Sequence, residues 1–108
     1  MIMTELAQAL NKFYPTRFSH FTSKQEPPFI CYIDTDYDNI SADNKIIVEG
    51  VYIDIELYTK TKDLIAERKI KSFLNANELP YSQSPTIFIE SEGLFQCIFS
   101  VELIQKIN

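Results

Sequence analysis

The stretch VYIDIELYT constrains the fold most, because apolar and polar side chains alternate strictly along it. One set would point to the same side of an extended chain: Val51, Ile53, Ile55 and Leu57. The intervening set would point to the other side: Tyr52, Asp54, Glu56 and Tyr58. This period of two predicts a strand with one face against a core and the other toward solvent. A core therefore has to be supplied by the rest of the chain.

Two amphipathic helices are predicted on either side of this strand. In residues 3–13, apolar side chains recur at helical spacing, with Thr4 as the expected N-cap and Pro15 as the stop. The second helix begins near Asp63 and closes between Asn77 and Pro80. Its predicted apolar stripe is Leu64, Ala66, Ile70, Phe73 and Leu74.

The remaining segments favour strands. Residues 16–23 and 27–34 hold β-branched and aromatic runs separated by a polar, proline-ended turn, and the KIIV run before Glu49 and Gly50 is also strand-like. Gly50 itself suggests a bulge or a tight turn. Two further runs joined by SEG, residues 91–93, predict a C-terminal hairpin. We therefore expect one α+β domain over residues 1–108, ordered helix, three strands, helix, two strands, with a mostly antiparallel or mixed sheet under the helices.

Composition argues against several classes of function. The formal charge of -5 has the wrong sign for a protein that neutralises phosphates, so nucleic-acid binding by sequence readout is not expected. Two glycines cannot build a glycine-rich phosphate loop, and His20, the single histidine, has no companions at zinc-finger or nucleophile-and-base spacing. We expect no enzyme, no catalytic or metal-binding residues and no cofactor.

The location of the protein can also be predicted. The first residues have neither the charge pattern of a secretory signal nor the apolar length of a membrane span, so we expect no membrane association. A cytosolic location keeps thiols reduced. Cys31 and Cys97 both lie in apolar strand runs, and we expect both to be buried free thiols.

The stretch DTDYDNISADN, residues 34–44, raises the question of a calcium loop, because Asp34, Asp36 and Asp38 alternate in it. Counting from Asp34, a calcium loop needs glycine at the sixth position and a bidentate glutamate at the twelfth. These positions hold Asn39 and Lys45, so we expect no specific calcium binding. The stretch is predicted to be a polar loop of about ten residues, either a solvated turn or a functional loop, since it is longer than a hairpin needs.

Several phrases of the sequence resemble one family: PPFICYID, then ADNK, then IELYTKTKD, then IESEGLFQ. Together, across about residues 26–104, they are similar to the tail completion or tail terminator proteins of long-tailed phages and prophages of Gram-positive bacteria. The resemblance implies a non-enzymatic, structural virion assembly protein. Such subunits form a six-membered ring at the head-proximal end of the tail tube, stop its growth and join the tail to the head.

The resemblance implies partners and a place of action. The partners would be other copies of the chain, in a hexameric ring in the virion that could be a monomer in isolation, the tail tube protein and a head-completion or connector protein. The protein would act in the host cytoplasm during assembly and then in the virion tail. In this family the loop that corresponds to residues 34–44 tends to reach toward neighbouring subunits or the tube. The alternative is a small cytosolic binding or regulatory domain encoded by a mobile element.

The expected protein interface combines the acidic stretch with the polar face of the alternating strand, because acids can find basic groups on a partner and tyrosine suits protein contacts. A half-exposed sheet face without a partner would look the same in sequence. The candidate interface residues are Asp34, Asp36, Tyr37, Asp38, Ile40, Tyr52, Asp54, Glu56 and Tyr58.

Overall fold

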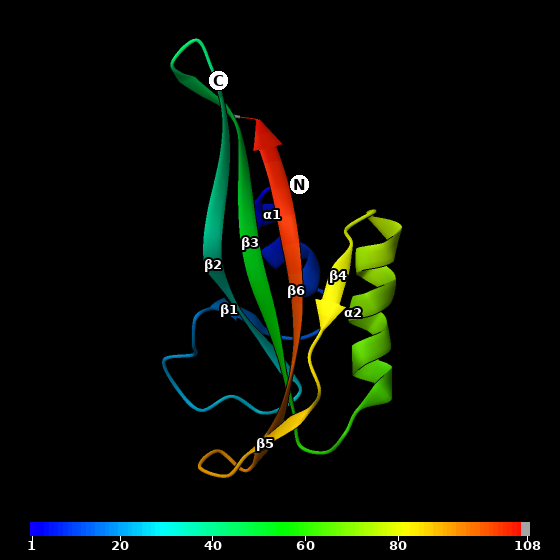
Figure 1. The fold of residues 1–108 in the computed structure, drawn as a ribbon. Coiled ribbons are helices and arrows are strands. Elements are labelled where there is room, and N and C mark those ends of the chain that lie inside the picture. The colour runs from blue at the N-terminus through cyan, green and yellow to red at the C-terminus, as the bar shows by residue number, and fades with distance from the viewer. Residues whose placement is uncertain (107–108) are drawn as a thin grey trace.

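The computed structural model describes the backbone of residues 1–106 and the side chains of residues 1–105. It contains two helices and one mixed sheet of six strands (Figure 1). The elements in chain order are α1 (Met3–Leu10), β1 (Thr16–Phe18), β2 (Phe29–Ala42), β3 (Lys45–Thr59), α2 (Leu64–Ala76), β4 (Tyr81–Gln83), β5 (Ile87–Ile89) and β6 (Leu94–Lys106).

The sheet is built around three long strands. Its order is β1-β2-β3-β6-β4, and β5 pairs with the beginning of β6. β1 runs parallel to β2, and the other pairs are antiparallel. The predicted α+β class and mixed sheet are confirmed. The strand count was wrong, because β4 adds a third strand after α2. β4 has only three residues, Tyr81–Gln83, which is too short for an alternating pattern to be detected in the sequence.

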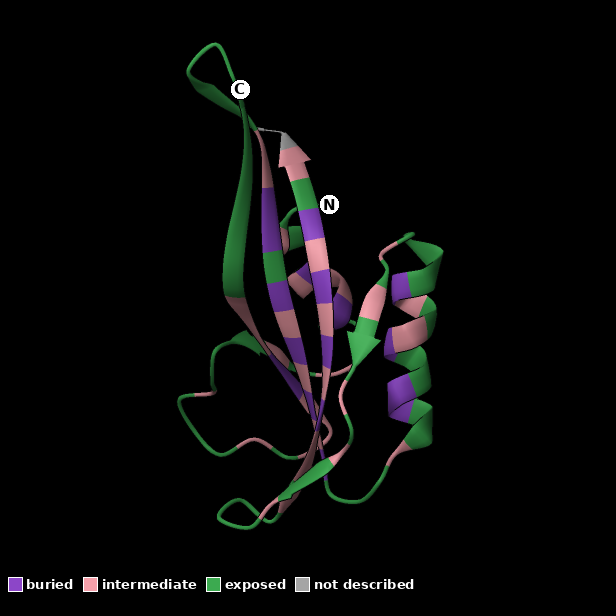
Figure 2. Ribbon diagram, viewed as in Figure 1, coloured by how far each residue is buried: buried purple, intermediate pink, exposed green. Residues whose placement is uncertain are grey.

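The alternating stretch forms a strand, as predicted, and this strand lies at the centre of the sheet. The side chains of its apolar set are at most 3% exposed. Each lies directly opposite a buried residue of β6: Val51 opposite Leu103, Ile53 opposite Val101, Ile55 opposite Phe99, and Leu57 opposite Cys97. Cross-strand pairs of this kind are the unit of sheet stabilisation. Figure 2 shows the resulting buried stripes along β3 and β6.

Helix α1 packs against this buried face of the sheet. Leu6 and Leu10 are fully buried in the same core as the β3 side chains. The helix ends at Leu10, earlier than predicted, and Thr4 is not its cap. Instead, the backbone N–H of Ile2 donates to Oε1 of Glu5 at 2.9 Å. This places one carboxylate in the first turn, where the helix dipole favours it.

Helix α2 joins the same core and begins and ends as predicted. Oδ1 of Asp63 accepts a hydrogen bond from the Ala66 backbone N–H at 3.0 Å, and Asn77 is the C-cap. Three members of the predicted stripe are fully buried: Ala66, Ile70 and Leu74. Leu64, however, is 63% exposed, so its inclusion in that stripe was wrong. It lies in the first turn, on the side of α2 that faces away from the sheet.

Glu67 is a buried charge that ties α2 to β4. Its side chain is 4% exposed, its Oε2 lies 2.8 Å from Nζ of Lys62, and its Oε1 accepts from Nε2 of Gln83 at 3.0 Å. A buried carboxylate is tolerated when it is paired and hydrogen-bonded in this way. No sequence pattern indicates this contact, because it joins residues that are far apart in the chain.

The predicted loop over residues 34–44 is wrong, because most of it belongs to β2. β2 and β3 form one long hairpin that turns only at Asp43 and Asn44. Both residues have positive φ, 52° and 63°, which is the backbone of a tight hairpin turn whose twist matches the strands. Gly50 is likewise no turn: it lies within β3, opposite Asp38 in β2 and Ile104 in β6. The strand predicted over residues 16–23 is limited to Thr16–Phe18.

Candidate interaction surface

The far part of the β2–β3 hairpin, residues 36–51, is called here the hairpin arm. It projects from the body of the molecule in Figure 1 and is largely exposed in Figure 2. β1 pairs only with residues 30–32 of β2, and the described part of β6 ends at Lys106, opposite Val48. The tip of the arm is therefore a two-stranded ribbon over the described residues. The longest dimension of the molecule is 51 Å, against 28 and 24 Å for the other two.

A β-bulge in β2 divides the three alternating aspartates. Asp34 lies opposite Ile53, whereas Asp36 lies opposite Tyr52, so Thr35 is an extra residue between them. Directly opposed residues share a face of the sheet. Asp34 therefore belongs to the helix-covered face, and Asp36 and Asp38 belong to the open face. The three carboxylates do not converge on one point.

On the helix-covered side, Asp34 and Tyr37 bind each other. The Tyr37 hydroxyl donates to the Asp34 carboxylate, and this hydrogen bond is the main reason why the pKa of Tyr37 is raised. The Tyr37 backbone N–H donates to Oδ1 of Asp36 at 2.9 Å, which holds that carboxylate beside the bulge. These local hydrogen bonds orient the side chains at the base of the arm, although these side chains stay exposed to solvent.

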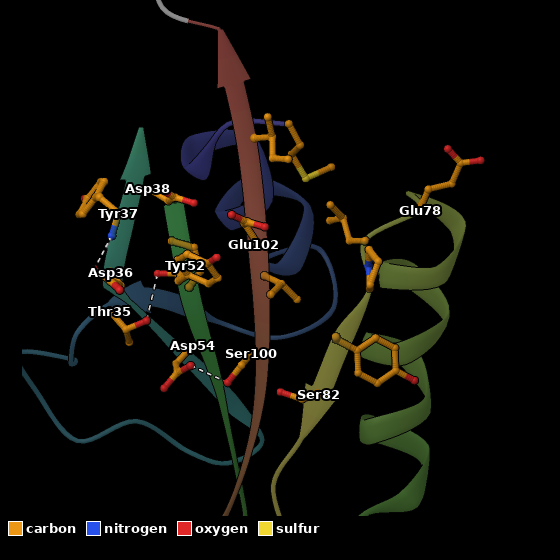
Figure 3. A pocket seen from close by; sticks show the side chains of 17 residues that line it. Thr35, Asp36, Tyr37, Asp38, Tyr52, Asp54, Glu78, Ser82, Ser100 and Glu102 are labelled. Carbon is orange, nitrogen blue, oxygen red and sulfur yellow. Dashed lines mark hydrogen bonds between the residues drawn. The ribbon is translucent and has the colours of Figure 1, made fainter. Parts of the chain in front are cut away.

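On the open side, the arm adjoins Tyr52 and the end of β6 (Figure 3). A hydrogen bond to the Glu102 carboxylate raises the pKa of Tyr52, and the negative charges of Asp38 and Asp36 raise it further. Gly50 allows Glu102 and the backbone of Asp38 to lie this close to β3, because glycine has no side chain. A Cβ atom at Gly50 would lie 2.7 Å from Oε2 of Glu102 and 3.2 Å from the backbone oxygen of Asp38. Glu102 is thus a surface residue that sequence reasoning missed.

Farther from the arm, the polar side chains of β3 form hydrogen bonds with other side chains of the same chain. Oδ1 of Asp54 accepts from Oγ of Ser100 at 2.7 Å. The Tyr58 hydroxyl donates to Oε1 of Glu56 at 3.0 Å and accepts from Nε2 of Gln96 at 2.9 Å. The structure therefore places Glu56 and Tyr58 in an internal polar cluster, separate from the acids of the arm.

The 19–28 segment and the start of β2 cover this cluster. The Phe29 ring stacks on the Tyr58 ring with centroids 5.0 Å apart, and Phe21 packs edge-on against Phe29 at 5.3 Å. Burial raises the pKa of Tyr58 to about 12, and burial is also the main cause of the raised pKa of Glu56. Burial likewise raises the pKa of the Cys31 thiol to about 11, so it is a poor nucleophile. Cys31 and Cys97 are buried free thiols, as predicted.

The arm also exposes apolar side chains. Tyr37 is 48% exposed, Ile40 59%, Ile46 45% and Ile47 40%. Ile104, opposite Gly50 on β6, is 62% exposed. Of these, Ile46, Ile47 and Ile104 were missed, because the KIIV and VELI runs are typical of buried strands. A cluster of exposed apolar residues of this kind is typical of an interaction site.

The carboxylates of the arm lack basic partners among the side chains of residues 1–105. Within that range, the one ion pair closer than 4 Å is between Lys62 and Glu67. The described residues contain no group of three His, Cys, Asp or Glu side chains that could hold a metal ion. None of the described helices is long and apolar enough to cross a membrane. What the arm offers is therefore negative charge next to exposed isoleucine and tyrosine.

The chain matches no family model, and no curated protein is significantly similar to it in sequence.

Proposed function

We propose that the protein is a non-enzymatic assembly subunit of a long phage tail, which forms a ring at the head-proximal end of the tail tube. The proposal starts from the resemblance of residues 26–104 to tail completion and terminator proteins. The structural observation that carries it is the hairpin arm, which combines exposed isoleucines with carboxylates that have no described basic partner. Folding alone gives no reason for such a combination.

A ring subunit uses such an arm in a simple way. Two-stranded ribbons are marginal on their own, and a neighbouring subunit that covers the apolar side chains stabilises the arm. A cyclic assembly repeats one modest contact around its axis, so each interface can be weak while the closed ring is stable. The acids add specificity, because a partner surface must supply complementary positive charge.

The ring would then have two further partners. One face would meet the last ring of tail tube protein and stop its growth, and the other would meet the head-completion or connector protein. The protein would act in the host cytoplasm and remain in the virion tail. The open sheet face beside the arm, with Asp54, Tyr52 and Glu102, lies next to the expected subunit contact.

Assembly with tail tube protein encoded in the same gene cluster tests this proposal. Tube protein would be polymerised with and without the chain, and tube lengths and ends would be measured by negative-stain electron microscopy. We expect ring-shaped caps and shorter tubes when the chain is present. The matched control is the D36K/D38K variant, which should fold but leave the tubes long, because it reverses the charge of the arm.

Either of two results would contradict the proposed function. One is a wild-type chain that stays monomeric and leaves both tube ends and tube length unchanged. The other is a gene neighbourhood that lacks tail and head-completion genes. A monomer that binds some other cytosolic protein through the arm would instead support a small binding or regulatory domain.

A further inference from the structure

A second exposed apolar surface lies on the outer side of α2. Leu64 is 63% exposed, Ile65 is 72% exposed, and Phe13, which follows α1, is 38% exposed. Together with Arg68 and Phe73 they line a shallow groove. This α2 groove is lined by these five residues together with Lys69 and Ser72.

The charge of the α2 groove is opposite to that of the arm. Residues 60–71 contain five Lys and Arg side chains and two acids. Both acids already have partners within the chain, since Asp63 caps the helix and Glu67 is buried in an ion pair with Lys62. The charge left to solvent beside the groove is therefore positive. In the arm, four carboxylates accompany one lysine.

The tip of the arm and the start of the α2 groove in one chain are too far apart to meet. β3 begins at the tip of the arm and runs 15 residues to Thr59, shortly before α2. At a rise of about 3.3 Å per residue, this separates the tip from the end of β3 by roughly 46 Å. Figure 1 shows the tip of the arm at one end of the molecule and α2 alongside the body, with the start of the helix far from that tip. The arm can therefore reach an α2 groove only on another copy.

We propose that the α2 groove receives the hairpin arm of a second copy of this chain. The isoleucines of the arm cover Leu64 and Ile65, and Arg68 pairs with a carboxylate of the arm, since its planar guanidinium suits such a contact. The contact joins two different surfaces and is therefore heterologous, and such contacts close into rings when the rotation between subunits allows it. The inference rests on the proposed self-assembly and assigns the surface that receives the arm.

Complementary charge reversal tests the contact directly. The arm variant is D36K/D38K. The groove variant is R68E/S72E, which uses two exposed residues of the groove lining and spares Lys69, whose Nζ lies 5.1 Å from the Tyr14 ring centroid. Sedimentation velocity over a wide concentration range measures association, and circular dichroism melts check that each variant is folded. E90K/E92K, in the exposed turn before β6, is the matched control with the same change of charge as the arm variant.

Each variant alone should associate at least about tenfold more weakly than the wild type, because like charges then face each other across every contact. Mixing the two variants should restore assembly with alternating subunits, since each arm then finds a groove of opposite charge. A single chain that carries all four changes should also assemble. The control should behave like the wild type.

The outcomes separate this inference from the proposed function. If D36K/D38K abolishes assembly while R68E/S72E does not, the α2 groove is not the receiving surface, and ring formation through the arm stands. If the mixture of folded variants fails to associate, the inference is also wrong. If the wild type does not self-associate at any concentration, even with tube protein present, both the inference and the proposed ring fall.

Discussion

The same two strands, β2 and β3, behave differently in the body and in the arm. In the body, Ile53 and Ile55 of β3 lie between paired strands under two helices, and the 19–28 segment covers part of the opposite face. In the arm, the backbone pairing continues, but only its base at Val51 joins the core, and its isoleucines stay exposed. The backbone hydrogen bonds thus continue from the body into the arm, whereas the isoleucines are buried only in the body.

This difference separates what shapes the hairpin from what stabilises the protein. A net backbone hydrogen bond contributes only about 1 kcal/mol, and much of the stability of a sheet comes from the apolar surface that it buries. The arm is therefore held in place by the folded body and adds little to the free energy of unfolding. Its side chains are free to serve a contact with another molecule.

The largest expected effect contrasts one isoleucine of the body with one of the arm. Ile55→Ala should lower the free energy of unfolding by about 2–5 kcal/mol, because the side chain is fully buried and leaves a cavity. Ile40→Ala should change it by less than about 0.5 kcal/mol, because the side chain is already 59% exposed. Urea unfolding followed by circular dichroism measures both.

Similar losses at the two positions would contradict the contrast, since they would mean that the arm is as buried as the body in solution. Performing the Ile40→Ala measurement at several protein concentrations provides a control. A cost that appears only at high concentration would show that a second copy covers Ile40.

A smaller effect is expected at Gly50, where the arm meets the body. Gly50→Ala should cost about 1 kcal/mol, because the new methyl group would crowd Oε2 of Glu102 and the backbone oxygen of Asp38. Adding Glu102→Ala should recover part of this loss, since only the carboxylate contact is then removed. Denaturant unfolding of the single and double variants, with Glu102→Ala alone as the control, measures the coupling. Full additivity of the two changes would rule out this close approach.

The smallest expected effect concerns the covered polar cluster. Burial, together with the negative charge of Asp54, raises the pKa of Glu56 above its ordinary value of 4.5, so the ionised carboxylate disfavours the folded state at pH 7. Glu56→Gln should therefore stabilise the protein at pH 7 by an amount within about 0.5 kcal/mol, while still accepting from the Tyr58 hydroxyl. Below the ordinary pKa, wild-type Glu56 is protonated in both states and the difference should disappear.

Melting curves of wild type and Glu56→Gln between pH 4 and pH 7 follow this difference. Ser100→Ala, which removes the partner of Asp54 and leaves the cluster around Glu56 intact, is a suitable control. A difference that grows as the pH is lowered would have the wrong sign and would show that the Glu56 charge is favourable in the fold.

Sequence patterns predicted the body well because its elements carry their own periodicity. The alternation in β3, the Asp63 cap of α2 and the apolar runs around Cys31 and Cys97 all correspond to what the structure shows. In each case the chain contrasts apolar with polar residues at the spacing of a strand or helix. Such a contrast exists only where one side of an element is buried.

The arm has no such contrast, so its strand conformation follows from tertiary contacts and could not be predicted from its own residues. Aspartate and asparagine disfavour strands, yet residues 34–42 are held as one by pairing with β3 and by the turn at Asp43 and Asn44. The bulge at Thr35, which puts Asp34 and Asp36 on opposite faces, depends on the register between the two strands. Register is a property of the pair, and one strand's sequence does not contain it. The spacing of residues along the chain was thus enough to predict most of the core, whereas the pairing of distant segments sets the directions in which the charges of the arm point.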